Sequence, residues 1–211
     1  MSKFVRSSKF RHVFGTPGKK EECWDGIQMS KNAWDSDYLD VNGKYIAVCW
    51  QTAGGGAVGI LDAAKPGKLG KVGLLTGHKG PVLDLQFSPF NDNLVATVSE
   101  DTTVKIWQIP QGGLTETTED AAQTLSGHGR KVGTCNFHPS ANNILATSAL
   151  DFSVKIWDIE AGKEQFAVPG HTGIIQSCVW NYDGSLLATY CKDKKVRVID
   201  PRSSNVVSEA E

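Results

Sequence analysis

The sequence predicts an all-β protein of the propeller architecture, with about four repeated sheets along its 211 residues. Three observations predict this fold. The first is a Gly-His pair that recurs at Gly77-His78, Gly127-His128 and Gly170-His171, so that successive repeats are 50 and 43 residues long. The second is the alternation of apolar and polar residues inside each repeat, which is the period of a half-buried strand. The third is the lack of any sustained helical period, and together these features indicate stacked four-stranded units.

The unit that begins at Gly77 shows the order of strands. Residues 83–87 alternate as Leu-Asp-Leu-Gln-Phe, and the turn-forming run Ser-Pro-Phe-Asn-Asp follows at 88–92. Residues 94–98 form a continuous apolar and β-branched run, as expected of a strand that is covered on both faces. A third strand is predicted at 104–106 and a fourth at 123–125, just before the next Gly-His pair. This unit is therefore predicted to hold four antiparallel strands.

The remaining units follow from the same signals. The two later units repeat this order, whereas the first lacks both the Gly-His pair and the tryptophan and shows two strands, around 45–48 and 58–61. The polar and acidic stretch 112–122 is interpreted as a loop inserted into the second unit. Gly54-Gly55-Gly56 is predicted to be a hairpin turn, because no Gly-Lys-Ser/Thr follows it as in a phosphate-binding loop. The predicted units are a basic strand or arm at 1–23, a degenerate blade at 24–76, and blades at 77–126, 127–169 and 170–211.

Composition and charge limit the class of protein. No apolar run approaches the ~20 residues that a membrane-spanning helix needs, and the start of the chain lacks the apolar stretch of a secretory signal. The five cysteines form no Cys-x-x-Cys pair, so they are interpreted as small core residues of a protein in a reducing compartment. Trp24, Trp34 and Trp50 are likewise predicted to be core residues. Residues 1–20 carry six basic residues and no acidic one, which indicates an acidic partner or an import presequence.

The repeat resembles that of the WD-repeat family. The three units after the first each start with Gly-His, and Ile156-Trp157-Asp158 closes the best-preserved copy. In this family the matching residues form a buried hydrogen-bond chain that ends on the tryptophan indole and ties the entering loop to the middle strands. The resemblance therefore implies three structural sets: His78, Thr97, Asp101 and Trp107; His128, Thr147, Asp151 and Trp157; and His171, Thr189 and Asp193, with Ile199 in place of the tryptophan.

The same side chains permit a second interpretation, because a hydroxyl, an imidazole and a carboxylate are the chemical types of a catalytic triad. Two facts favour the structural interpretation. The set recurs three times, whereas an active site is normally singular, and threonine is a less usual nucleophile than serine or cysteine. We therefore expect no catalytic residue, no cofactor and no metal ligand. On this interpretation Asp151→Ala lowers thermal stability and removes no activity, and activity-based labelling would discriminate the enzyme hypothesis.

Segments outside the repeat resemble the coronins. The resemblance begins at 8–15 with Ser-Lys-Phe-Arg-His-Val-Phe-Gly, continues through 34–36 and 53–56, and includes 191–195 and Asp200-Pro201-Arg202. It covers essentially the whole chain. It implies a propeller of seven blades, of which about four are present here. It also implies a non-enzymatic protein that binds actin filaments in the cytoplasm, at the cell cortex.

The resemblance further implies partners and contact residues. Actin filaments are the implied partner, and no contact with nucleic acid is expected. Contact with the branched-actin nucleating complex and oligomerisation would require C-terminal segments that this chain lacks, since no heptad stretch occurs in it. A basic residue on the first blade of coronins is tied to filament binding, and Gln28 stands at that position. Arg6, Lys19 and Lys20 are the neighbouring basic candidates for meeting an acidic filament.

Alternatives to this assignment remain open at the level of sequence. The chain could be a generic WD-repeat scaffold that docks other proteins, an enzyme that uses one of the hydroxyl, imidazole and carboxylate sets, or a protein whose basic leader is a presequence. Four blades of an expected seven would leave two open sheet faces. Because a blade needs neighbours on both sides, we expect the isolated chain to be unstable or prone to aggregation.

Overall fold

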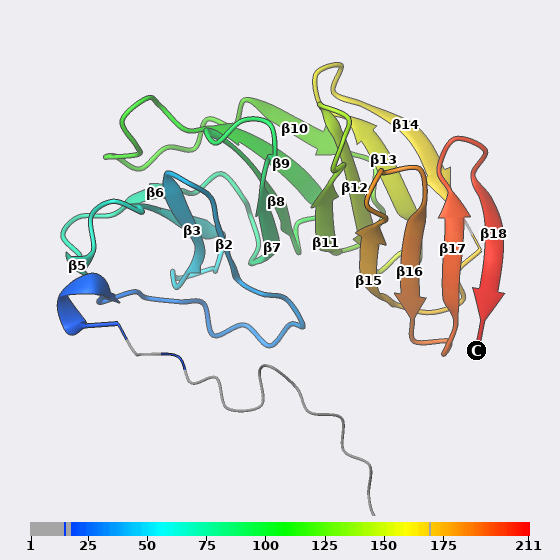
Figure 1. Ribbon diagram of the computed structural model, residues 1–211, viewed down its shortest axis with the longest axis horizontal. Helices are drawn as coiled ribbons and strands as arrows, with labels where there is room; N and C mark the ends of the chain where they lie inside the picture. Colours follow the sequence, from blue (N-terminus) through cyan, green and yellow to red (C-terminus); the bar gives the residue numbers. More distant parts are fainter. Residues whose placement is uncertain (1–14, 16–17, 169) are drawn as a thin grey trace, which may run out of the picture.

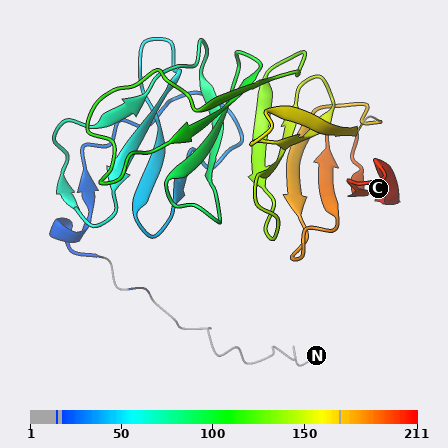
Figure 2. The same ribbon diagram turned by 90° about the horizontal axis from the view of Figure 1, so that it is seen from above.

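The structure is a computed structural model that describes residues 15, 18–168 and 170–211, and it confirms the all-β fold class. Four antiparallel sheets of four strands each follow one another along the chain and lie side by side as blades (Figures 1 and 2). The single helical turn in the described part is η1 (Lys20–Glu22). A short parallel pair joins β1 (Trp24–Asp25) to β5 (Gly67–Lys68) beside the first blade. Most of the predicted arm 1–23, Arg6 included, lies outside the described residues.

Within each blade the strands are neighbours in sequence order. The first blade consists of β2 (Leu39–Val41), β3 (Tyr45–Trp50), β4 (Ala57–Asp62) and β6 (Gly73–Leu75), and the second of β7 (Val82–Phe87), β8 (Leu94–Ser99), β9 (Thr103–Gln108) and β10 (Gln123–Ser126). The third consists of β11 (Val132–Phe137), β12 (Ile144–Ala149), β13 (Val154–Asp158) and β14 (Lys163–Val168), and the fourth of β15 (Ile175–Trp180), β16 (Leu187–Cys191), β17 (Val196–Asp200) and β18 (Asn205–Ala210).

The hydrophobic cores lie between neighbouring blades. On β9, Trp107 packs with Ile60 and Phe87 in the cluster between the first and second blades. Val104 and Ile106, from the opposite face of the same strand, pack in the cluster between the second and third blades. Burying such a side chain contributes about 1.5–3 kcal/mol. Because every cluster takes side chains from two blades, no blade covers its apolar faces alone.

The cysteines and tryptophans only partly follow the sequence-based prediction. Cys49, Cys135, Cys178 and Cys191 are buried, but Cys23 is exposed, so its assignment to the core is wrong. Trp50 is buried, whereas Trp24 and Trp34 are half-buried. The indole N–H of Trp24 donates to the Asp62 carbonyl over 3.3 Å, and that of Trp34 donates to the Gly133 carbonyl over 3.0 Å. These two rings therefore join separate segments of chain instead of filling a core.

Side chains connect the first strand of each blade to that of the next, and we call these bonds the inner-strand links. The strands β2, β7, β11 and β15 contact one another in that order. In three links a main-chain N–H donates to a side-chain oxygen of the preceding blade: Phe87 to Asp40 Oδ2 (2.8 Å), Cys135 to Asp84 Oδ2 (3.0 Å) and Phe137 to Gln86 Oε1 (2.5 Å). In the fourth, the Asn136 side-chain amide donates to the Cys178 carbonyl (2.7 Å). These hydrogen bonds fix the position of each blade relative to the next along the direction of their first strands.

The segment before β2 crosses two of these strands. Trp34 reaches Gly133 on β11, and the Ser36 hydroxyl donates to Asp84 Oδ1 on β7 over 3.1 Å. A Cβ atom at position 133 would lie 2.6 Å from the Trp34 ring, so this close approach requires glycine. The segment therefore fastens the first blade to the second and third.

Asp84 provides a pH-dependent prediction. Burial raises its pKa to about 6, although the Cys135 N–H and Ser36 favour the charged form. Since the unfolded value is about 3.9, the cost of ionising Asp84 in the folded state grows between about pH 4 and pH 6 and persists above that range. We expect Asp84→Asn, which keeps an acceptor for the Cys135 N–H, to raise the free energy of unfolding at pH 7.5 by about 1–2 kcal/mol.

Urea unfolding at pH 5 and pH 7.5 would measure this difference, which should be smaller at pH 5. The matched control is Asp120→Asn in the exposed insertion, with an expected change within about 0.5 kcal/mol. An Asp84→Asn chain that is less stable than the original at pH 7.5 would contradict the prediction.

Candidate functional site

The second blade brings together the four residues that the sequence singled out there, and we call such a set a tetrad. His78 lies in the loop that enters β7, Thr97 on β8, Asp101 in the turn after β8, and Trp107 on β9. The Trp107 indole N–H donates to Thr97 Oγ1 over 2.8 Å, and His78 Nε2 lies 2.7 Å from the same oxygen. His78 Nδ1 lies 3.0 Å from Asp101 Oδ2. Because an ionised carboxylate only accepts, Nδ1 carries the proton and Nε2 accepts from the threonine hydroxyl.

Asp101 holds the entering loop and the β8–β9 turn together. Its Oδ2 accepts the Lys79 N–H over 2.8 Å, and its Oδ1 accepts the Thr103 N–H and hydroxyl over 3.0 and 2.7 Å. Burial disfavours the ionised form, but hydrogen bonds from His78 and Thr103 outweigh burial and hold the pKa of Asp101 well below its usual value. The carboxylate is therefore charged at neutral pH, and its removal would leave several donors without an acceptor.

The third blade contains a second tetrad of the same geometry, formed by His128, Thr147, Asp151 and Trp157. The indole-to-hydroxyl, hydroxyl-to-imidazole and imidazole-to-carboxylate distances are 2.8, 2.8 and 3.1 Å. Burial lowers the pKa of His128, although Asp151 opposes this shift. The pKa of Asp151 is lowered to about 2, because hydrogen bonds from Ser153 and from the Gly129 N–H outweigh the effect of burial.

In each of these two blades a further hydroxyl residue, two positions after the aspartate, is hydrogen-bonded to the tetrad. The sequence analysis missed both of these residues. The hydroxyls of Thr103 and Ser153 donate to Asp101 and Asp151 over 2.7 Å each. They also lie 3.3 and 3.4 Å from the Nδ1 atoms of the two histidines. The spacing Asp-x-Thr/Ser at the same place in two repeats is the sequence signal that could have identified them.

The fourth blade differs from these tetrads. His171 Nε2 lies 2.8 Å from Thr189 Oγ1, but in the described residues no hydrogen bond joins Asp193 to His171, whose buried Nδ1 has no partner there. Asp193 instead accepts from the Arg197 guanidinium over 2.7 Å, which lowers its pKa. Ile199 stands where the tryptophans stand, and its side chain has no hydrogen-bond donor. This blade therefore holds a His–Thr pair and an Asp–Arg pair instead of one continuous chain.

The tetrads are enclosed, and this limits what they can do chemically. Thr97 and Thr147 are 0% exposed and Thr189 is 1% exposed, so a substrate could not reach these hydroxyls. Within residues 15, 18–168 and 170–211, no three His, Cys, Asp or Glu side chains lie together as metal ligands. In the same residues no helix is long and apolar enough to cross a membrane. Hydrogen bonding that stabilises the blades fits this geometry better than nucleophilic catalysis does.

The residues expected to contact actin lie in different places. The Gln28 carbonyl accepts the Gln51 N–H over 2.8 Å, which puts Gln28 at the end of β3. Lys19 precedes η1 and Lys20 begins it, and η1 packs beside β5 (Figure 1). Arg6 lies outside the described residues. The structure therefore does not join the three described candidates, Gln28, Lys19 and Lys20, into one surface.

Exposed basic residues that the sequence analysis missed lie where the Gly-His loops enter the blades, and we call this region the Gly-His end. Its loops carry four exposed basic residues that have no ion-pair partner in the described part of the chain: Lys79, Arg130, Lys192 and Lys194. Gln28 lies at the same end, because the turn after Gln51 meets the Gly-His loop through a Val82 N–H to Gly55 carbonyl bond of 3.0 Å. Separate repeats therefore contribute positive charge to one end of the molecule.

Family models match most of the chain. The model described as WD domain, G-beta repeat matches residues 69–108, 120–158 and 162–200, and the model of a domain of unknown function (DUF1899) matches residues 3–68. The WD-domain matches alone cover more than half of the chain. The four blades, the repeated tetrads and these matches define a WD-repeat propeller protein.

Individual relatives narrow the family. Coronin-A of Dictyostelium discoideum is 58% identical over 209 residues, which are 99% of this chain and 47% of that protein. Among solved structures, the WD40 domain of Toxoplasma gondii coronin aligns with a TM-score of 0.84 at 34% identity, over 87% of this chain and 47% of that one. The chain belongs to the coronin family, as its sequence predicts, and it spans about half the length of the relatives that it matches.

Proposed function

We propose that this chain binds actin filaments through the Gly-His end of its blades and performs no catalysis. The observation that carries the proposal is the 58% identity to Coronin-A along 99% of the chain, because the coronin resemblance implies filament binding. A site in the cytoplasm, at the cell cortex, belongs to the same proposal. Contact with the branched-actin nucleating complex would require segments beyond this chain.

The charge at the Gly-His end supports this proposal. Lys79, Arg130, Lys192 and Lys194 are exposed and unpaired in the described residues, and they would meet an acidic filament without first breaking an ion pair. Gln28 lies at the same end but carries no charge. An uncharged residue there weakens the contact that the family resemblance implies, so the neighbouring loops are proposed to supply the attraction.

Co-sedimentation with actin filaments tests the proposal. We expect binding to weaken as the salt concentration rises, because salt screens exposed charges over about 8–10 Å. Lys192→Gln combined with Lys194→Gln should weaken binding by about 2- to 30-fold, since each exposed ion pair contributes about 0.2–1 kcal/mol. Gln28→Arg should strengthen it by about 1.4- to 5-fold.

The matched control is Lys44→Gln combined with Lys163→Gln, which neutralises two lysines away from the Gly-His end and should leave the filament affinity unchanged. Lys19→Gln combined with Lys20→Gln tests the basic residues beside η1 separately. Binding that is insensitive both to salt and to all of these changes would rule out a basic contact surface. A failure to co-sediment would instead favour a WD-repeat scaffold with other protein partners.

A further inference from the structure

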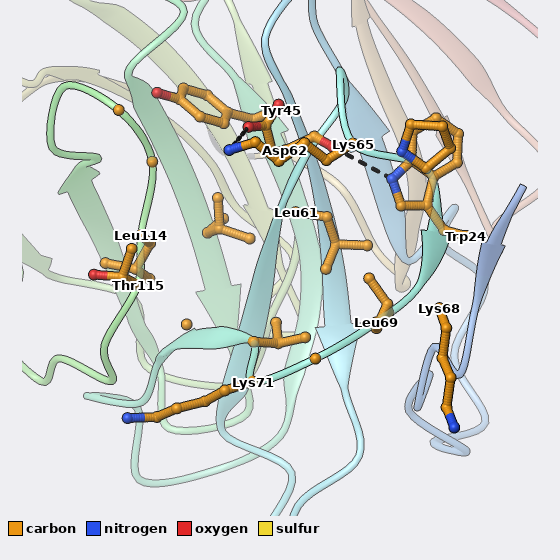
Figure 3. Close-up of a pocket in the computed structure, with 17 residues that line it drawn as sticks. Trp24, Tyr45, Leu61, Asp62, Lys65, Lys68, Leu69, Lys71, Leu114 and Thr115 are labelled. Carbon is orange, nitrogen blue, oxygen red and sulfur yellow. Dashed lines mark hydrogen bonds and ion pairs between the residues drawn. The ribbon is translucent and has the colours of Figure 1, made fainter. Parts of the chain in front are cut away.

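A groove of about 380 Å³ lies at the end of the first two blades that is opposite to the Gly-His end. It is lined by the connection from Asp62 to Gly73 and by residues 112–115 of the inserted loop. The side chains of Leu61 and Leu69 lie near each other, Leu114 lines the opposite side, and the three together form an apolar floor (Figure 3). This volume falls within the range of about 300–1,000 Å³ that is usual for ligand sites in proteins.

The walls of the groove are fixed by main-chain contacts. The insertion pairs with β6, because the Thr118 N–H donates to the Leu74 carbonyl and the Thr76 N–H donates to the Thr118 carbonyl, each over 2.9 Å. A Cβ atom at Gly73 would lie 2.3 Å from the Leu114 carbonyl oxygen, so this contact requires glycine. A groove with walls held in this way is preformed, which reduces the entropy lost on binding.

The far wall is held in the same manner. The Trp24 indole N–H donates to the Asp62 carbonyl, and the Gly67 N–H donates to the Cys23 carbonyl over 2.8 Å. These bonds attach β5 and its flanking residues to β1. Both sides of the groove are therefore anchored to the first blade.

The rim of the groove is basic. Lys65 forms an ion pair with Asp62 over 2.8 Å. Lys68 and Lys71 are exposed and have no ion-pair partner in the described residues, and Glu116 of the insertion forms no ion pair with them there. Their ammonium groups point in different directions away from the apolar floor (Figure 3). Separated charges around an apolar floor suit an extended ligand better than one small anion.

We propose that this groove binds an extended acidic peptide of a partner protein, with one apolar side chain on the leucine floor and carboxylates beside Lys68 and Lys71. Charge complementarity and the apolar floor together favour this occupant. A filament-binding surface at the Gly-His end would not compete with it. The two ends are joined by β3, whose six residues span about 17 Å between the Tyr45 and Trp50 ends.

Fluorescence anisotropy with the 211-residue chain tests the proposal. The probes are labelled peptides with a central Leu, Phe or Trp between runs of Asp and Glu, and the control peptides have Ser at the centre or Gln in place of the acids. We expect saturable binding of at least one acidic peptide and weaker binding of both controls. Lys68→Gln combined with Lys71→Gln should weaken the affinity by about 2- to 30-fold, and raising the salt should act in the same direction.

The matched control is Lys31→Gln combined with Lys163→Gln, which removes the same charge elsewhere and should leave the affinity unchanged. No removed side chain is buried, so unchanged melting curves would show that the variants fold. A shift of the Trp24 indole N–H resonance, assigned with Trp24→Phe, would report binding in the groove itself. The proposal is overturned if no acidic peptide binds, or if the Lys68/Lys71 variant binds the acidic peptide as well as the original chain does.

Discussion

Asp151→Ala is expected to lower the free energy of unfolding by about 2–3 kcal/mol. The carboxylate accepts from the His128 imidazole, the Gly129 N–H, and both the N–H and the hydroxyl of Ser153. Removing it leaves these donors without their acceptor, at about 1–3 kcal/mol for each group that stays buried. His128 is buried and cannot turn to water, so much of this cost is expected to come from its Nδ1–H. Urea unfolding at pH 7 would measure the change.

The pH dependence of the stability difference between the original chain and Asp151→Ala shows how much of that difference comes from the charge of Asp151. The folded pKa of Asp151 is about 2, below the unfolded value of about 3.9, so its stabilisation is complete above about pH 4 and is lost as the pH falls toward 2. The difference between the original chain and Asp151→Ala should therefore shrink over that interval. Asp120→Ala in the exposed insertion serves as the control and should change stability by less than about 0.5 kcal/mol. Equal effects of the two substitutions would contradict a stabilising role for the tetrad.

Trp34→Ala is expected to destabilise the chain by about 2–3 kcal/mol. A fully buried tryptophan costs about 3–5 kcal/mol on truncation, and Trp34 is half-buried, so the expected value lies below that range. The substitution also removes the hydrogen bond to the Gly133 carbonyl, which joins residues 99 positions apart in the chain. Without the ring, the segment before β2 keeps only the Ser36 contact with Asp84 as a described hydrogen bond to another blade's first strand. Thermal and urea unfolding would measure the loss.

Trp34→Phe divides this effect into its two parts. It keeps an aromatic ring but removes the indole donor, so it should cost about 1 kcal/mol and leave the packing largely in place. Gly133→Ala approaches the same contact from the other side, because its Cβ would lie 2.6 Å from the ring. A chain whose stability is unaffected by both Trp34→Ala and Gly133→Ala would show that the segment does not fasten the blades.

The fold could be predicted from the sequence because its signals are local and repeated. The alternation at 83–87 and the β-branched run at 94–98 correspond to β7 and β8, since each pattern depends only on which faces of a strand are covered. The two hairpin strands predicted at 45–48 and 58–61 lie within β3 and β4 for the same reason. The repeated Gly-His and Asp positions also allowed His78 and Asp101 to be assigned to one set, because both residues flank strands of the same blade.

The rest depends on contacts between segments that no local pattern connects. Nothing near Trp34 indicates that its partner is Gly133, and the exposure of Cys23 follows from its place before the short strand β1. In the fourth blade a single change of residue type determines which side chain the aspartate of the repeat binds. Arg197 stands where the other blades carry Lys105 and Lys155, and its guanidinium binds Asp193. The basic Gly-His end and the opposite groove also arise only when separate repeats are assembled.

The inner-strand links have a consequence for how such a protein can evolve. Each link joins a side chain of one blade to the main chain of the next. Gln86, for example, helps to set the position of the following blade along the direction of the first strands. In the fourth blade Val179 occupies the position of Gln86 and Asn136 and can form no such hydrogen bond. The blades therefore share a fold but are not interchangeable modules. Recombination that duplicated, deleted or reordered blades would preserve each sheet but would break the inner-strand links between blades. We therefore expect the blades to be inherited together, in their present order.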